Sequence, residues 1–363
     1  MKTVSDWGYI KDRFSAWWNG ELTETPLLSI IVRRDEPTET LEPPGVYKDP
    51  EDKYLNIEGL LADFRNNLRN SSYEADAFPS FTTNFGPGSI ALYLGSEPEF
   101  AWDTVWFKEV VEESWQNYPL KYNPDNKWWL LHHKLIKQAQ DASNGDFCID
   151  IPDLVENIDI LAAMRGPQAT CYDLIDEPEI IAERIKNLDD IYFKYYDTMY
   201  DIVKDENGGS SFTAFHIWGP GKTAKVQCDF AAMMSPSQFS DFIVPSIEKQ
   251  CKKLTNSLFH LDGKDAIKHV PALMEATSLK ALQWTPGAGQ PDGGDECWYP
   301  IYDQARTAGK SIWVYVSGSA NEIVEKTRKL VKRYGVNALY ILAGSTDKEA
   351  AAEIMKAYAG GFK

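Results

Sequence analysis

The feature that most constrains the fold of this chain is a repeated alternation of short apolar segments with longer helical patterns. Eight segments rich in β-branched and aromatic residues each precede a helical pattern; they cover residues 27–32, 80–85, 147–151, 212–217, 257–261, 279–284, 311–316 and 338–342. Apolar strands alternating with helices are typical of a parallel sheet covered on both faces. Eight such units predict an α/β fold of the (β/α)8 type, a TIM barrel. An open doubly wound sheet is the alternative.

The predicted barrel is a single domain over residues 1–363, with an N-terminal extension before the first strand. Two polar stretches, 35–56 and 86–124, are predicted surface excursions after the first and second strands. Three helices have recognisable ends. Asp125 is the predicted N-cap of a helix over residues 126–140, Pro178 opens a helix that runs through Ile202, and Ser235 caps a helix that runs to about Thr255.

Charge and composition exclude some classes of partner. The formal net charge is −17, which disfavours nucleic acid and anionic membrane surfaces, because binding phosphates requires clustered Lys and Arg. No run of 18 apolar residues occurs, and residues 1–14 lack the apolar stretch of a signal peptide, so we expect a cytoplasmic protein. The five cysteines include no C-x-x-C pair and are expected to be reduced.

Polar and aromatic residues gather at the predicted strand ends, where the active site of a TIM barrel is assembled. The set comprises Arg33, Arg34, Asn84, Asp150, Asp153, His216, Trp218, His260, Asp262, Gln283, Trp284, Tyr315, Ser317 and Gly344. The His260-x-Asp262 spacing places an imidazole beside a carboxylate, either as a metal pair or as an oriented base. We therefore predict that these two residues are catalytic.

Further residues of this set are predicted to contact the substrate. They are Asn84, His216, Trp218, Gln283, Trp284 and Tyr315, together with Arg33 or Arg34 as a partner for a substrate carboxylate. Asp229 is expected to orient His260, with capping of a loop as the alternative. The twelve tryptophans of the chain are explained either by a large aromatic core or by a pocket for a flat ligand.

A second candidate metal site follows from spacing alone. Glu97, Glu112 and His133 form a Glu-x14-Glu-x20-His pattern. Two carboxylates and one imidazole can hold a zinc ion and leave one coordination position open for chemistry. The competing interpretation is that the glutamates are surface charges and that His133 packs within a helix.

The same spacing resembles a zinc signature of methyltransferase I in the corrinoid-dependent O-demethylase systems. Three longer stretches, 173–185 (DLIDEPEIIAERI), 233–253 (MMSPSQFSDFIVPSIEKQCKK) and 258–263 (LFHLDG), resemble the uroporphyrinogen decarboxylase superfamily. That superfamily has a barrel fold and includes true decarboxylases and zinc-dependent corrinoid methyltransferases. The resemblance implies the barrel that the alternation also predicts.

Two departures from family patterns point to the methyltransferase branch. True uroporphyrinogen decarboxylases carry an M-R-Q-A-G-R type run after the first strand, whereas this chain reads IIVRRDEP, with only Arg33 and Arg34 to meet a porphyrin's carboxylates. The coenzyme M methyltransferases and cobalamin-independent methionine synthases use an H-x-C pair, whereas here Asp262 takes the place of that cysteine. Zinc bound by oxygen-rich ligands is the pattern that remains.

The resemblance implies a zinc-dependent methyltransferase that moves a methyl group from a methoxylated aromatic to the cobalt(I) of a corrinoid on a partner protein. Zinc is the expected cofactor, and the corrinoid is expected to come from the partner. The alternatives are a decarboxylase of a small carboxylated substrate and a non-catalytic small-molecule binding barrel. The sequence does not identify the methoxylated substrate.

Overall fold

The central element of the fold is a seven-stranded sheet, seen here in a computed structural model that describes every residue except 2–3, 5, 345–346 and 363. The strand order is β2-β1-β13-β12-β11-β10-β9. The strands are β1 (Leu27–Arg33), β2 (Ser71–Ala75), β9 (Thr223–Gln227), β10 (Asn256–Asp262), β11 (Ala281–Thr285), β12 (Ser311–Val316) and β13 (Leu339–Ala343). All neighbours pair in parallel except β2, which runs antiparallel to β1.

The other strands form three short pairs. They are the parallel pair β3 (Ser80–Phe81) and β6 (Cys148–Ile149), the antiparallel pair β4 (Pro98–Phe100) and β5 (Val105–Phe107), and the antiparallel pair β7 (Ser210–Phe212) and β8 (Ile217–Gly219). Within the described residues the hydrogen-bonded strands do not close into a ring, because β3 and β6 pair only with each other. The structure is therefore mixed α/β, with a large and mostly parallel sheet.

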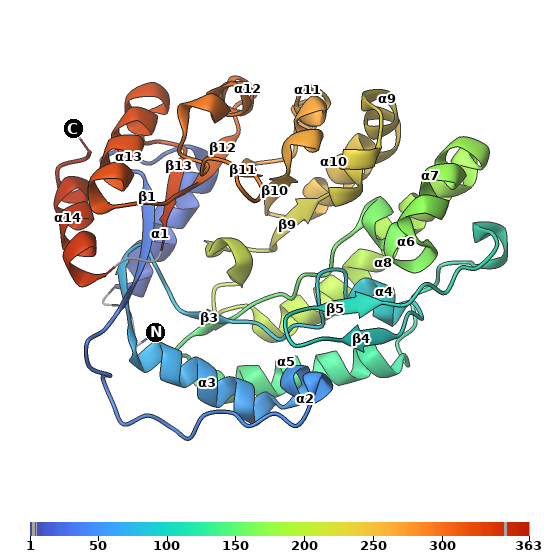
Figure 1. The fold of residues 1–363 in the computed structure, drawn as a ribbon, viewed down its shortest axis with the longest axis horizontal. Coiled ribbons are helices and arrows are strands. Elements are labelled where there is room, and N and C mark those ends of the chain that lie inside the picture. Colours follow the sequence, from blue (N-terminus) through green and yellow to red (C-terminus); the bar gives the residue numbers. More distant parts are fainter. Residues whose placement is uncertain (2–3, 5, 345–346, 363) are drawn as a thin grey trace.

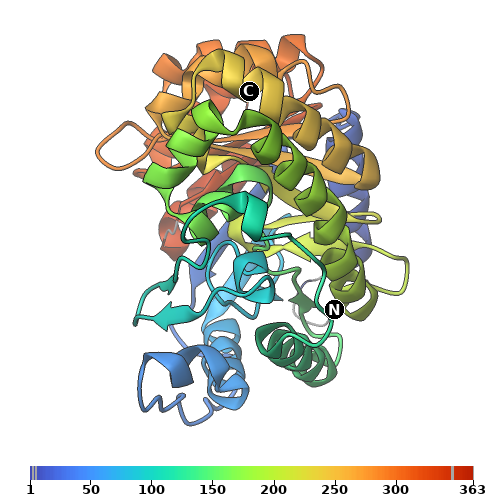
Figure 2. The same ribbon diagram turned by 90° about the vertical axis from the view of Figure 1, so that its right-hand side faces the viewer.

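Helices line the outer side of the arc that the sheet forms (Figure 1). The α-helices are α1 (Trp7–Asn19), α2 (Pro50–Leu55), α3 (Ile57–Arg69), α4 (Ile90–Tyr93), α5 (Lys127–Ser143), α6 (Asn157–Arg165), α7 (Pro167–Asp176), α8 (Pro178–Val203), α9 (Pro236–Gln238), α10 (Val244–Lys253), α11 (Val270–Leu273), α12 (Tyr299–Thr307), α13 (Ala320–Tyr334) and α14 (Lys348–Ala359). Figure 2 shows α2 and α3 in blue and the β4–β5 hairpin in teal, at the end of the molecule opposite to the orange helices.

Short 3-10 and π turns complete the element list. The 3-10 turns are η1 (Trp115–Asn117), η2 (Thr213–Phe215), η3 (Asp229–Met233), η5 (Lys264–His269) and η6 (Glu296–Trp298), and η4 (Phe239–Ile243) is a π-helical turn. The η3 turn follows β9 directly, so the carboxyl end of that strand leads straight into a tight turn. That turn begins at Asp229, which matters for the site described below.

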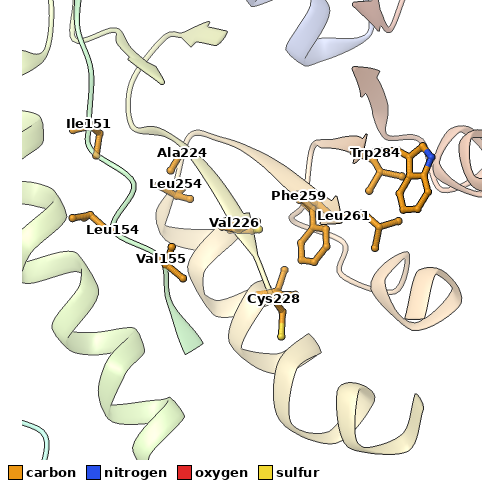
Figure 3. Close-up of a cluster of buried hydrophobic side chains, with 14 of the residues drawn as sticks. Ile151, Leu154, Val155, Ala224, Val226, Cys228, Leu254, Phe259, Leu261 and Trp284 are labelled. Carbon is orange, nitrogen blue, oxygen red and sulfur yellow. The ribbon is translucent and has the colours of Figure 1, made fainter. Parts of the chain in front are cut away.

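Alternation along the strands divides the core in two, because successive side chains point to opposite faces of a sheet. Val226, Phe259, Leu261 and Trp284 project to the helix-covered face, where they join the larger apolar cluster (Figure 3). On the other face, Leu27, Leu258, Ala281, Trp313 and Tyr340 pack in a second apolar cluster with α1 and the β7–β8 hairpin. The polar side chains at the strand ends lie on this second, inner face.

The alternating pattern predicted most of the strands. Seven of the eight predicted segments contain a strand with parallel pairing, namely β1, β3, β6, β10, β11, β12 and β13. The strand predicted over residues 212–217 is wrong. There the chain forms a hairpin interrupted by η2, and His216 adopts a left-handed backbone with φ of 47° that no strand allows.

The parallel strand next to β10 is instead β9, which the pattern of apolar residues did not predict. Its sequence, TAKVQ, carries one β-branched apolar residue and a lysine, so it lacks the composition of a buried strand. All five residues of β9 are nevertheless buried. Pairing with β10 and burial within the folded chain, and not local propensity, make this segment a strand.

Two of the three predicted helix ends are confirmed. Pro178 opens α8, and Ser235 caps α9 through a capping box with Gln238. Asp125 is not the N-cap of α5, because the Asn126 side chain accepts the backbone N–H groups of Trp128 and Trp129. None of the helices in the described part of the chain has the length and apolar character needed to cross a bilayer.

Candidate metal centre

Three neighbouring strands place polar side chains side by side on the inner face. Gln227 of β9 pairs in register with His260 of β10, and His260 pairs with Gln283 of β11. Residues paired across parallel strands point to the same face, so these three side chains form one polar row near the carboxyl ends of the strands. The row ends at Trp313 of β12, which is apolar and buried.

Asp229, His260 and Asp262 form a group that could hold a metal ion. One ligand atom from each, a ring nitrogen and two carboxylate oxygens, lies within 4.8 Å of the others. Within the residues that the structure describes, this is the one group of three or more His, Cys, Asp and Glu side chains with such geometry. His260 and Asp262 come from the same face of β10, two residues apart, and Asp229 comes from the start of η3.

Gln283 fixes the tautomer of His260. The Gln283 side-chain amide donates to Thr285 Oγ1 at 2.8 Å, which leaves its Oε1 facing His260 Nδ1 in a hydrogen bond. Because Oε1 can only accept, Nδ1 must carry the proton. The lone pair of the neutral ring is then on Nε2, and a hydrogen-bonded Nδ1–H is the arrangement that orients a metal-binding histidine.

Asp159, on α6, holds the loop that carries Asp229. Its two oxygens accept the backbone N–H groups of Asp229 and Phe230, each at 2.8 Å. Gln227 Nε2 bridges the two acids, donating to Asp229 Oδ2 at 2.9 Å and to Asp159 Oδ2 at 3.3 Å. The position of Asp229 is therefore fixed by hydrogen bonds to Asp159 and Gln227 as well as by its own turn.

The electrostatics of the site favour a cation. Burial, together with the Asp229 carboxylate, raises the pKa of Asp159 to about 6. Burial also raises the pKa of Asp229, and Asp262 raises it further, although His260 and Lys225 act in the opposite direction. Burial and the Lys225 ammonium lower the pKa of His260, so its imidazole is neutral at pH 7. A divalent cation between these ligands would offset the repulsion between the carboxylates.

Lys225 is a buried cation beneath the triad. Its side chain is only 3% exposed, and its ammonium group pairs with Asp153 Oδ1 at 2.6 Å and with Gln227 Oε1. Glu156, also buried, accepts the backbone N–H of Gln227 at 2.6 Å. Because the Lys225 ammonium donates to Gln227 Oε1, the Nε2 group of Gln227 points toward Asp159 and Asp229.

A pocket of about 570 Å3 opens beside Asp229. Asp229, Gln227 and Asp159 line one side of it, and the other walls come from the β4–β5 hairpin, α6 and η3, including Trp106, Phe107, Ile160, Phe230 and Met233. This volume is within the range of pockets that bind small ligands. Asn84 lines a smaller neighbouring pocket of about 260 Å3 together with Asp153.

The structure does not assemble the ligand set predicted from spacing. Glu97 is half-exposed and pairs with Lys127 at 2.8 Å, while Trp128 Nε1 donates to it at 3.1 Å. His133 lies on α5 with its ring against Trp129, and Glu112 is exposed in the loop after β5. These side chains are not among the described groups with metal-binding geometry.

Several residues predicted to contact substrate lie elsewhere. Trp284 is fully buried against Trp298 on the helix-covered face, because it alternates with Gln283. Trp218 is buried in the second apolar cluster against Trp7. Both are core residues.

The remaining predicted contacts have other positions. The backbone carbonyl of His216 accepts the Tyr340 hydroxyl at 2.7 Å. Tyr315 is 39% exposed near the end of β12. Arg33 and Arg34 line a separate pocket with Lys348, and Arg34 Nε donates to the backbone carbonyl of Ser71.

Gln227 and Lys225 were missed because β9 itself was not recognised, and Asp159 was missed because it reaches the site from α6. One signal was present: Gln227-x-Asp229 has the same spacing as His260-x-Asp262, and both follow buried strand residues. No protein-family model matches the chain, and no curated protein matches it either.

Proposed function

We propose that this chain is a zinc-dependent methyltransferase that moves a methyl group from a methoxylated aromatic to the cobalt(I) corrinoid of a partner protein. The observation that carries the proposal is the convergence of Asp229, His260 and Asp262 at the carboxyl ends of parallel strands. Parallel α/β sheets bind their ligands at this end. The resemblance of residues 173–185, 233–253 and 258–263 to the uroporphyrinogen decarboxylase superfamily supports the same reaction.

The three side chains fit zinc better than the spacing-based set does. Zinc is bound at about 2.0–2.2 Å by imidazole and carboxylate, so ligand atoms around one ion lie roughly 3–4 Å apart. Atoms already within 4.8 Å of one another need little movement to reach that arrangement. Three protein ligands also leave a position free, and zinc held there would supply a Lewis acid for the ether oxygen of the substrate.

The protein's own residues would position the reactants. Gln283 keeps Nε2 of His260 free for the metal, and Asp159 holds Asp229 in place. The aromatic and aliphatic walls of the pocket would hold the ring. In the reaction the O–CH3 bond breaks and its electron pair stays on the phenol oxygen, which takes a proton from water. Cobalt(I) supplies the pair for the new Co–CH3 bond and becomes formally cobalt(III).

We further propose that the strands belong to one distorted (β/α)8 barrel in a single domain. β1, β3, β6 and β9 to β13 number eight, and each pairs in parallel with a neighbour. The backbone N–H of Ile151 also donates to the carbonyl of Ser211, linking the β6 segment to the hairpin before β9. Chemistry with cobalt(I) requires reducing conditions, consistent with the expected cytoplasmic location and the five free cysteines.

The test is methyl transfer in vitro. Zinc-loaded protein is mixed anaerobically with cob(I)alamin and 4-methoxybenzyl alcohol, and the spectrum is followed for methylcob(III)alamin while the demethylated phenol is measured by mass spectrometry. We expect both products with the wild type and neither with His260→Ala, whereas His133→Ala retains activity. Absence of both products with the zinc-loaded wild type, or full activity of His260→Ala, contradicts the proposal. Release of carbon dioxide from 4-methoxybenzoate would instead support a decarboxylase.

A further inference from the structure

The charged side chains that line the pocket beside Asp229 are all acidic. Glu109, Asp159 and Asp229 line it, and none of the described residues that line it is Lys, Arg or His. The buried cation Lys225 is already paired with Asp153 and Gln227, and Arg165, which interacts electrostatically with Glu109, is paired with Asp173. The charge of the zinc ion proposed at the triad would be offset by the carboxylates of Asp229 and Asp262, so an anionic ligand in this pocket would still meet Glu109 and Asp159.

The rest of the lining suits a flat organic molecule. Trp106 is 65% exposed and projects from β5 at the pocket, and Phe107, Ile160 and Phe230 are further apolar contacts. Aromatic faces attract cations through their quadrupole, and carboxylates at the edge of an aromatic pocket reinforce that attraction. The aromatic walls and the carboxylates of the pocket therefore both favour a positively charged aromatic ligand.

The arginines expected to bind a substrate carboxylate are not at this pocket. Arg33 and Arg34 line the separate pocket of about 610 Å3 between β1, β2 and α14. Because both arginines lie at that separate pocket, neither of them can pair with the carboxylate of a benzoate bound beside Asp229. This observation is independent of the acidic residues that line the pocket beside Asp229. The pocket beside Asp229, in contrast, includes a residue of the candidate metal-binding triad.

We infer that the methyl donor lacks a carboxylate and that the pocket prefers a methoxylated aromatic amine to a methoxybenzoate. Glu109 is a specificity-determining residue of this pocket. It is exposed, lies at the pocket and is not part of the metal-binding group. The inference rests on the proposed function for the methoxylated ring, but the charge preference concerns binding alone and does not depend on turnover.

The test compares three ligands of the same shape and different charge. Binding of 4-methoxybenzylamine, 4-methoxybenzyl alcohol and 4-methoxybenzoate to the zinc-loaded full chain is measured by calorimetry at pH 7.5, without corrinoid. We expect the amine to bind at least about tenfold more tightly than the benzoate, with the alcohol between them. If the benzoate binds as tightly as the amine, or if none of the three binds below millimolar concentration, the inference is overturned.

Variants of Glu109 test whether the charge preference arises at this pocket. Glu109→Lys is expected to reduce the amine-to-benzoate ratio to below about threefold, and Glu109→Gln is expected to give an intermediate ratio. Glu99→Lys is the matched control, because Glu99 is an exposed glutamate of the adjacent strand β4 and does not line the pocket. An equal reduction in Glu99→Lys and Glu109→Lys would overturn the assignment to this pocket. If the charge preference holds while no methyl transfer occurs, the proposed reaction fails and the binding inference stands.

Discussion

The carboxylate of Asp159 accepts the backbone N–H of Asp229 at 2.8 Å, although the two residues are 70 positions apart in the chain. This bond fastens the turn after β9 to α6 and so sets where the Asp229 side chain can reach. Asp159 is not a member of the metal-binding group itself. It is therefore a positioning residue, whose contribution can be separated from that of the ligands.

Removing the Asp159 carboxylate should weaken zinc binding. Asp159→Ala deletes the acceptor for two backbone N–H groups, and loss of an outer hydrogen-bond partner typically costs about 10–100-fold in metal affinity. Zinc affinity is measured by competition with a chromophoric chelator. Asp241→Ala, which removes an exposed acid of η4, is the control and should leave the affinity unchanged. Equal affinities for wild type and Asp159→Ala would contradict the positioning role.

Gln283 should act on the metal through His260. In Gln283→Leu the Nδ1 proton loses its acceptor and the ring can rotate, so we expect zinc affinity to fall by about 10–100-fold. In Gln283→Glu the carboxylate can still accept the proton, so affinity should recover to within roughly fivefold of the wild type. The same competition assay checks both variants. A Leu variant that binds as well as the Glu variant would show that Gln283 does not orient the ring.

Trp284 is predicted to stabilise the fold without contacting substrate. It is fully buried against Trp298, and truncating a buried tryptophan costs about 3–5 kcal/mol of unfolding free energy. We expect that loss for Trp284→Ala in urea denaturation, while Trp102→Ala, at a 52% exposed position, changes stability by no more than about 0.5 kcal/mol. A stable Trp284→Ala variant with lost ligand affinity would instead place this ring at the pocket.

His132 should make the protein sensitive to acid. The ring is buried on α5, where the Tyr93 hydroxyl lies 2.6 Å from Nδ1 and the Thr83 hydroxyl 2.9 Å from Nε2, and burial lowers the pKa of His132 from 6.5 to about 3. Between these values the unfolded chain binds a proton that the folded chain does not, so this contribution to stability is lost as the pH falls below 6.5.

The variant that isolates this effect is His132→Gln, which does not titrate. From pH 7 to pH 5 the wild type should lose about 2 kcal/mol more unfolding free energy than the variant, since each pH unit corresponds to about 1.4 kcal/mol per proton. Urea denaturation at the two pH values measures the difference. Equal losses in both proteins would mean that His132 is protonated in the folded state.

The sequence predicted most strands because their burial on both faces requires apolar composition. β12 and β13 are near-continuous apolar runs, β10 and β11 each contain three apolar residues, and the order of these strands in the sheet follows their order in the chain. β9 was not predicted because its polar residues Lys225 and Gln227 are buried, and specific hydrogen-bond and ion-pair partners compensate their burial. Composition does not reveal such partners. Likewise, residues 212–217 have the composition of a strand, but the left-handed backbone conformation of His216 prevents a continuous strand there.

The site was predicted in part for a related reason. His260, Asp262 and Gln283 were found because they occupy strand ends, and a strand end locates a side chain by topology alone. The set of Glu97, Glu112 and His133 was chosen by spacing, and spacing along loops and helices does not fix distance. Asp159 joins the site only through the packing of α6 against η3, a contact that depends on the whole fold.

Zinc is predicted to bind at His260 and Asp262 and not at Glu97, Glu112 and His133. Elemental analysis of the purified, zinc-dialysed chain should give about one zinc per protein for the wild type and for the variant that combines Glu97→Ala, Glu112→Ala and His133→Ala. The variant that combines His260→Ala and Asp262→Ala should retain none while circular dichroism shows an intact fold. One zinc retained without His260 and Asp262, or lost without Glu97, Glu112 and His133, would contradict the proposed metal centre.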